Sequence, residues 1–203
     1  RGDAARAVAW GWMRTGDLTR AREVLARHGE EGDERVTAWM ALYEGDLKTA
    51  RTGLRRLDET THEAVLALSV LARTRADTSR MVGSAFLALA RSDTAAAVEG
   101  FEQAATSLTD ASSLLLTMAA RLSIAAADTA RSLRLWQTVV ERYPDAPEAA
   151  EAELDWARVL RRRGETKAAV ARLEHLILTY PQSALVPQAR RELELAKGAI
   201  PPE

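Results

Sequence analysis

The 203-residue sequence contains no Cys, no Asn and only three Lys residues, which are Lys48, Lys167 and Lys197. Without Cys, the chain has no disulfides, no thiol catalysis and no Cys-ligated metal sites. Long hydrophobic runs are also missing. The longest stretch without Asp, Glu, Lys or Arg is residues 175–189, which contains two prolines and is shorter than the roughly 20 apolar residues that a membrane-spanning helix needs. We therefore expect a chain that does not span a membrane.

The charge of the chain is balanced. It has 28 basic and 29 acidic side chains, a formal net charge of -1, and both signs are spread along the sequence. A nucleic-acid-binding module normally concentrates Lys and Arg, so we expect no nucleic-acid partner. Gly and Pro are not enriched, and 47% of the residues are hydrophobic, which is enough for a folded core. Because the sequence starts with Arg1, we expect a further segment upstream.

Short polar steps, each a small residue followed by an acid, separate stretches in which apolar residues recur at helical spacing. The steps are Gly16-Asp17, Gly45-Asp46, Ala76-Asp77, Ser92-Asp93, Ala127-Asp128 and Gly164-Glu165. Steps this short predict tight turns between antiparallel helices. The acid is expected in the first turn of the following helix, where the helix dipole favours it. The alternation that is typical of strands is absent over any useful length, so the sequence predicts an all-α fold.

When the polar steps are aligned, the stretches superpose as a repeat. A small residue of the first helix pairs with Ala or Ser of the second, as in Ala9/Ala21, Ala38/Ala50, Ala85/Ala97, Ala120/Ser132 and Ala157/Ala169. A large apolar residue follows in each case: Leu25, Leu54, Phe101, Trp136 and Leu173. Small residues let two helices approach closely, and the large residue fills the next interface. This pattern predicts helical hairpins that bury their apolar faces against their neighbours.

Two Tyr-Pro pairs, Tyr143-Pro144 and Tyr180-Pro181, mark helix ends. Together, the paired helices, the Gly-Asp turns and the terminal prolines resemble the tetratricopeptide repeat family. The resemblance implies a single right-handed α-solenoid of about twelve antiparallel helices over residues 1–203. Its units are about 2–28, 31–57, 78–109, 113–144 and 150–181, and a capping helix follows at 183–197.

The resemblance is incomplete in two places. Glu34 and Glu153 stand where the motif has an aromatic residue in its first helix. Residues 61–75 fit only as an irregular extra helix, or as the first helix of a unit that shares residues 78–91 with the next unit. We expect a bend or an irregular contact there, to which Gly83 contributes.

Catalytic and metal-binding motifs are absent from the sequence. His28, His62 and His175 lie far apart, and none has a second His one helical turn away to form a zinc pair. The segment Glu59-x-x-His62-Glu63 is typical of the start of a polar helix. No Gly-rich phosphate loop, nucleophile elbow or Ser-x-x-Lys motif is present. We therefore expect no enzymatic activity, no cofactor and no metal site.

In tetratricopeptide solenoids, the first helix of each unit lines a concave face on which peptides bind. The resemblance therefore implies a partner-binding face made of Arg6, Trp10, Met13, Arg14, Arg35, Trp39, Leu42, Tyr43, Phe86, Leu89, Met118, Arg121, Arg158, Arg161 and Arg162. This face would be aromatic at its N-terminal end and cationic at its C-terminal end. Because aromatic and Arg side chains anchor protein interfaces, a partner segment with apolar anchors followed by acidic residues would fit.

A structural explanation stays open for the same residues. The aromatic side chains can pack between successive helices, and Arg161, Arg162 and Arg163 lie at a helix C-terminus, where cations offset the helix dipole. One binding mode of the family is not expected. Tetratricopeptide proteins that grip the C-terminal carboxylate of a partner use Asn and Lys on this face, and this chain has no Asn.

These features favour a non-catalytic scaffold that binds a partner protein or peptide. The last two units, with Tyr-Pro endings and the segment Pro181-Gln-Ser-Ala-x-x-Pro-Gln-Ala-Arg, resemble bacterial envelope proteins of the family, among them outer-membrane assembly lipoproteins. This implies a periplasmic or membrane-peripheral place in complex assembly. The alternatives are a regulatory helical-repeat domain of a larger signalling or transcriptional protein and a homo-oligomerisation module. The sequence leaves the oligomeric state open.

Overall fold

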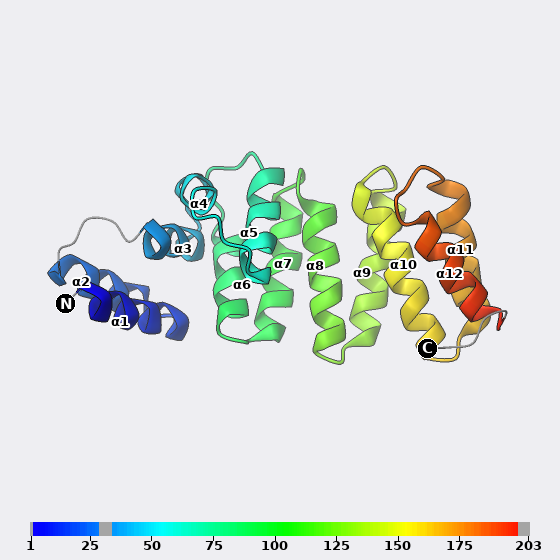
Figure 1. Cartoon of the computed structure of the whole chain (residues 1–203), viewed down its shortest axis with the longest axis horizontal. Helices are drawn as coiled ribbons and strands as arrows, with labels where there is room; N and C mark the ends of the chain where they lie inside the picture. Colours follow the sequence, from blue (N-terminus) through cyan, green and yellow to red (C-terminus); the bar gives the residue numbers. More distant parts are fainter. Residues whose placement is uncertain (1, 29–33, 199–203) are drawn as a thin grey trace. The chain divides into compact units, whose positions relative to one another are not determined.

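The computed structural model describes residues 2–28 and 34–198, and this part of the chain is helical throughout (Figure 1). Twelve α-helices follow one another there, and the described residues form no strand beyond a single antiparallel bridge between Asp46 and Thr78. The expected all-α class is confirmed. The chain divides into two compact units, Arg1–Ala127 and Asp128–Glu203.

Among the described residues, the first unit is built from three antiparallel helix pairs and two further helices. Its helices are α1 (Gly2–Thr15), α2 (Leu18–His28), α3 (Glu34–Glu44), α4 (Leu47–Leu54), α5 (His62–Arg73), α6 (Arg80–Ala90), α7 (Thr94–Ser107) and α8 (Ser112–Ala125). α1 packs with α2, α3 with α4, and α7 with both α6 and α8. The expected ranges 2–28, 31–57 and 78–109 each contain one of these pairs, although residues 29–33 lie outside the described part of the chain.

The second unit contains four helices in the described residues: α9 (Thr129–Arg142), α10 (Pro147–Arg162), α11 (Thr166–Thr179) and α12 (Val186–Ala196). α10 packs with α9 and α11, and α12 lies beside α10 and α11, as Figure 1 shows. The boundary between the two units falls inside the expected repeat 113–144, because α8 belongs to the first unit and α9 to the second. The grouping of all the helices into five repeats of one solenoid stays a prediction.

The turns between paired helices require left-handed backbone conformations. The φ angle is 89° at Gly16, 82° at Gly45 and 78° at Gly164, a region in which glycine has no steric penalty. Ser92 and Ala127 occupy the same position of the turn with φ angles of 60° and 61°. The polar steps were therefore correctly predicted as turns at these five places.

The acidic residue of the step has a different role from the one expected. Asp46, Asp93 and Asp128 precede their helices as N-cap residues, and each side chain accepts a hydrogen bond from the backbone N–H three residues later. This satisfies one of the N–H groups that have no partner inside the helix. The prediction that these acids lie in the first helical turn is thus corrected.

The sixth step, Ala76-Asp77, is not a helix–helix turn. It lies in a segment that runs along the α3–α4 turn, where the N–H of Lys48 donates to the carbonyl of Asp77 (3.0 Å) and the N–H of Ser79 donates to that of Gly45 (2.8 Å). These two bonds surround the isolated bridge between Asp46 and Thr78. The segment therefore holds the start of α6 against the end of α3.

Gly83 makes the contact between α6 and α3 possible. A Cβ atom at this position would lie 2.7 Å from both the backbone N of Gly45 and the carbonyl O of Tyr43, closer than side-chain carbon can approach. α6, and not α5, is consequently the helix that packs on α3 and pairs with α7. Residues 61–75 contain the helix α5, and its interpretation as an extra helix outside the repeats stays a prediction.

The end of α5 is held by a side chain from α4. Arg51 Nε donates to the carbonyl O of Leu71 at 2.8 Å, and its Nη2 donates to those of Thr74 and Ala76 at 3.0 and 2.9 Å. The last carbonyl groups of a helix have no partner inside it. Arg51 satisfies one of them and also binds the segment that leads to α6.

Two helix pairs of the first unit make close contacts between Ala and Gly. A Cβ atom at Gly53 would lie 2.6 Å from Ala38 Cβ, and one at Gly100 would lie 2.8 Å from Ala85 Cβ. Ala38 and Ala85 are the small first-helix residues of the predicted repeat, but the closest approach occurs one turn beyond their predicted partners. The same contact thus recurs in the α3–α4 and α6–α7 pairs.

The core of the second unit reaches into α12. Leu154 and Leu173 contact Val186 and Ala189 of that helix in one apolar cluster, as a capping helix would. Trp136 on α9 is also buried, with 2% of its surface exposed. None of the helices in the described part of the chain combines the length and the apolar character needed to cross a bilayer.

Candidate partner-binding surface

The structure places many of the predicted partner-binding side chains in the core. The buried ones are Met13, Trp39, Leu42, Tyr43, Phe86 and Met118. Their apolar surface is removed from water by neighbouring helices, which stabilises the fold. In this structure these six side chains do not form an accessible face, which favours the structural explanation for them. Phe86, for example, packs edge-on against Phe101 of α7, with a ring-centroid distance of 5.2 Å.

The remaining predicted residues reach the surface. Arg14, Arg35, Arg121 and Arg162 are exposed, and Arg6, Trp10, Leu89, Arg158 and Arg161 are half-buried. The exposed and half-buried set consists mainly of cations, with Trp10 as its aromatic member. Whether these residues bind a partner stays a prediction.

Predicted residues of the first two repeats meet on α1 and α3. The Trp10 and Trp39 rings meet edge to face with a centroid distance of 6.5 Å, and the Trp39 and Tyr43 rings are 5.8 Å apart. The Arg35 guanidinium carbon lies 4.9 Å from the centroid of the Trp10 ring, which is a cation–π geometry. Together with Arg14 of α1, we call these residues the aromatic patch.

Two carboxylates from the segment before and within the first turn of α5 bind the aromatic patch. Trp39 Nε1 donates to Glu59 Oε2 at 3.3 Å, and Tyr43 OH donates to Glu63 Oε1 at 3.1 Å. Arg35 forms an ion pair with Glu59. Sequence reasoning missed both acids, since they appeared to be only the start of a polar helix. Their role depends on where α5 packs, for which the sequence has no local signal.

Burial dominates the electrostatics of this contact. The pKa of Glu63 is raised mainly because its carboxyl is withdrawn from water, and the hydrogen bond from Tyr43 and the charge of Arg14 oppose this rise. The pKa of Tyr43 is also raised, first by burial and then by the charge of Glu63. The cations of the patch therefore only partly offset the cost of burying Glu63.

The cationic end of the predicted face is likewise bound by an acid of the chain. Arg158 Nε lies 2.9 Å from Glu192 Oε1, and Arg161 Nη2 lies 3.3 Å from Glu192 Oε2. Glu192 belongs to α12, so these ion pairs join α12 to α10. Arg158 also approaches Asp155 at 3.8 Å, the i+3 pair that the helix spacing predicts.

A second buried acid lies between α10 and α11. The Glu153 side chain is fully buried, with its Oε1 2.6 Å from His175 Nδ1 and 3.5 Å from Arg172 Nη1. Burial raises the pKa of Glu153, and Arg172 and His175 oppose this rise. Among the described residues, no group of three His, Cys, Asp or Glu side chains could hold a metal ion.

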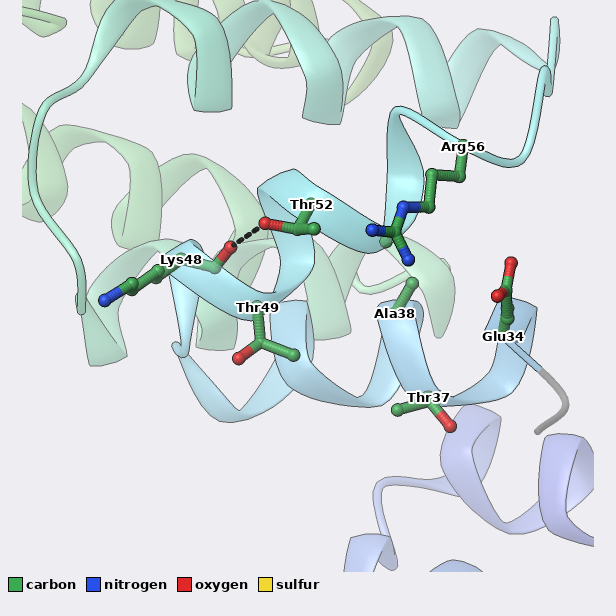
Figure 2. Close-up of a pocket in the computed structure, with 8 residues that line it drawn as sticks. Glu34, Thr37, Ala38, Lys48, Thr49, Thr52 and Arg56 are labelled. Atoms are coloured by element: carbon green, nitrogen blue, oxygen red, sulfur yellow. Dashed lines mark hydrogen bonds between the residues drawn. The ribbon is translucent and has the colours of Figure 1, made fainter. Parts of the chain in front are cut away.

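Cavities open on the described surface. One, of about 420 Å³, lies between α3 and α4 and is lined by Glu34, Thr37, Ala38, Lys48, Thr49, Thr52, Gly53 and Arg56. Figure 2 shows Lys48 at one end of it and Arg56 with Glu34 at the other. The second, of about 540 Å³, lies between the two Tyr-Pro turns, from Pro144 to Ala150 and from Thr179 to Ser183. Neither cavity was predicted from the sequence.

Comparison with known proteins locates one repeat in the chain. Residues 151–183 match the family model described as tetratricopeptide repeat. The matched residues cover most of α10, all of α11 and the turn after it. No curated protein and no solved structure gives a significant match to the chain. The α10–α11 hairpin, with its Gly164 turn and its Tyr180-Pro181 ending, is therefore similar to a tetratricopeptide repeat.

Proposed function

We propose that this chain is a non-catalytic scaffold of the tetratricopeptide repeat type that binds a partner protein. The match of residues 151–183 carries this proposal, because tetratricopeptide repeats generally mediate protein–protein interactions and are typically not catalytic. The other helix pairs of the chain, with the same left-handed turn at Gly16 and Gly45, support an extension of the repeat beyond the matched residues.

The accessible Arg and Trp side chains are the proposed partner contacts. In the first unit these are Trp10, Arg14 and Arg35, and in the second unit they include Arg162 at the end of α10. Arg and Trp are enriched among the residues that dominate binding energy at interfaces. An acidic partner segment remains the proposed ligand, since the accessible charges of this set are positive.

Affinity capture from the source cells tests the proposal. The bait variant combines Arg14→Ala with Arg35→Ala, and its matched control combines Arg55→Ala with Arg134→Ala, which removes equal charge from exposed positions. We expect the wild type and the control to retain the same specific proteins and the Arg14/Arg35 variant to lose them. Trp39→Ala is unsuitable here because its ring is buried. Equal retention by all three baits would move the binding surface elsewhere, and capture of no specific protein would reject the scaffold function.

We also propose a place in the bacterial envelope, in a periplasmic or membrane-peripheral assembly complex. Its support is the resemblance of the last two predicted repeats to envelope proteins of the family, with Pro144 and Pro181 as the second residues after α9 and α11. Cell fractionation with an antibody against the native protein tests this location. Recovery in the cytoplasm would favour the regulatory domain of a larger signalling or transcriptional protein.

Self-association is the second candidate function. Leu178 on α11 is 80% exposed, which is unusual for a large apolar side chain on a folded surface. Light scattering over a range of protein concentrations tests it. A mass that rises with concentration in the wild type but not in Leu178→Gln would support self-association, and a constant monomer mass would reject it.

A further inference from the structure

We propose that the aromatic patch is a binding site for an acidic segment of the partner protein, and that the chain's own segment 59–63 occupies this site as a displaceable internal ligand. The inference rests on the proposed scaffold function and names the chemistry of its partner. The partner segment would carry two carboxylates spaced like Glu59 and Glu63.

The aromatic patch presents hydrogen-bond donors and a cation to segment 59–63. Trp39 Nε1 and Tyr43 OH donate hydrogen bonds to Glu59 and Glu63, and the Arg35 guanidinium pairs with Glu59. Each of these three contacts has a carboxylate as its acceptor. Charge-assisted hydrogen bonds of this kind are stronger than neutral ones. The site therefore selects acidic ligands.

Segment 59–63 is separate from the helices that form the patch. In the predicted arrangement of repeats, α5 is an extra helix outside the paired helices, and the patch belongs to α1 and α3. Between Leu54 and His62 the chain has no helix, and Asp58 there has a φ angle of 45°, a strained conformation for a residue with a side chain. Thr60, Thr61 and His62 are exposed. The two carboxylates thus make the main contacts between the segment and the patch.

The segment can move while the body of α5 stays in place. The body of α5 is anchored by buried Ala67 and Val70, and its C-terminal end by the three hydrogen bonds from Arg51. Glu63 lies in the first helical turn, and helix ends open locally at low cost. Withdrawal of Glu59 and Glu63 therefore requires that this turn unwinds and that Ala64, which is buried in the same turn, becomes exposed.

The state in which segment 59–63 occupies the patch, which we call the closed state, has an energetic cost. Burial raises the pKa of Glu63 despite its hydrogen bond from Tyr43, so the carboxylate gains less from the patch than it loses in hydration. A partner acid bound to the same donors would lose hydration as well, so its advantage over the internal ligand is that it binds without the strained backbone at Asp58. The geometry thus describes a closed state that an acidic competitor can replace.

The test uses a fluorescein-labelled synthetic peptide that contains residues 56–66 of this chain as the probe. It is titrated into the wild type, into Glu59→Gln/Glu63→Gln, and into that variant with Arg35→Ala added. We expect the double Gln variant to bind the probe about tenfold more tightly than the wild type, because its internal ligand lacks the charge-assisted contacts. Addition of Arg35→Ala should abolish this gain.

Two controls separate the site from general charge effects. Glu99→Gln with Glu194→Gln removes two exposed acids far from the patch in sequence and should bind the probe as weakly as the wild type. A probe with Gln in place of both acids should not bind the double Gln variant. Equal affinity of the probe for the wild type and the double Gln variant would overturn the proposal.

Hydrogen exchange of the wild type provides a readout that does not depend on how the variants fold. Excess probe should increase amide exchange in residues 57–64 and leave the body of α5 protected, and unchanged exchange in residues 57–64 would overturn the proposal. A wild-type dimer that exchanges segment 59–63 between copies, detected by light scattering, would make a second copy the ligand and would also overturn it. Failure of the probe leaves the capture experiment above untouched, so the two proposals can fail separately.

Discussion

The carboxylate of Glu153 lies 2.6 Å from the imidazole Nδ1 of His175, between the two helices that match a tetratricopeptide repeat. The acid is fully buried, whereas 42% of the His175 side chain is exposed. Arg172 approaches the same oxygen and stacks over Trp156, 4.8 Å from the ring centroid. An ionisable side chain thus stands at the position to which the tetratricopeptide resemblance assigns an aromatic residue, and Arg172 on α11 brings a positive charge close to it.

The first prediction concerns the pH dependence of this buried acid. Burial raises the pKa of Glu153 above the ordinary value of 4.5, so the folded protein binds this proton more readily than the unfolded chain. The free energy of unfolding should therefore fall as the pH rises above 4.5 through the raised pKa, and this contribution should then level off. In Glu153→Gln this part of the fall should be absent.

Urea denaturation between about pH 4 and pH 7 measures this difference. The charged groups around the acid are Arg172 and His175 on α11, and Tyr180, whose own pKa is raised by burial and by the charges of Glu153 and Asp145. Glu99→Gln, an exposed acid, serves as the control. A pH-independent stability difference between Glu153→Gln and the wild type would contradict the prediction.

The second prediction tests the contact between α6 and α3. Gly83→Ala places a methyl group 2.7 Å from the backbone N of Gly45, and the backbone cannot yield as a flexible side chain can. We expect a loss of about 1–3 kcal/mol in the free energy of unfolding, measured by chemical denaturation. Gly11→Ala is the matched control because nothing lies within 4 Å of its added Cβ on α1. The free energy of unfolding of the control should rise by about 0.5–1 kcal/mol. An equal change in this free energy at both positions would contradict the contact.

The third prediction concerns the side chain that holds α5. Arg51→Ala removes the three hydrogen bonds to the carbonyl groups of Leu71, Thr74 and Ala76. We expect a loss of about 2–3 kcal/mol in the free energy of unfolding and faster amide exchange at the end of α5 and in residues 74–79. Arg55→Ala changes an exposed Arg directly after α4. It should neither lower the free energy of unfolding nor speed this amide exchange. Unchanged exchange in residues 74–79 of Arg51→Ala would show that Arg51 is not their anchor.

The helices and most turns could be predicted from the sequence because their signals are local. A small residue followed by an acid marks the turn at Gly16, Gly45 and Gly164, and the backbone there adopts the left-handed conformation. The step at Ala76-Asp77 has the same composition but a different structure. Its conformation is set by hydrogen bonds to the distant α3–α4 turn, and such contacts leave no periodic trace in the sequence.

The candidate site was less predictable because its members are chosen by packing. Helical spacing assigns Trp39 and Phe86 to a face of their helices, but it does not tell whether a neighbouring helix covers that face. The structure buries both. Glu59 binds Arg35 only because the segment that precedes α5 passes beside α3. The spacing of residues along a helix can be predicted from the sequence. Which side chains of different helices meet depends on how the helices pack.

The last prediction tests the core of the second unit. Trp136 on α9 occupies the large apolar position of its predicted repeat and is 2% exposed. Trp136→Ala should leave a cavity and lower the free energy of unfolding by about 3–5 kcal/mol, as followed by circular dichroism in urea. Trp156→Ala is the comparison, because this ring is only half-buried and stacks with Arg172, and its loss should cost less. A Trp136→Ala protein that unfolds at the same urea concentration as the wild type would show that this ring is not part of the core and that the repeat alignment at α9 is wrong.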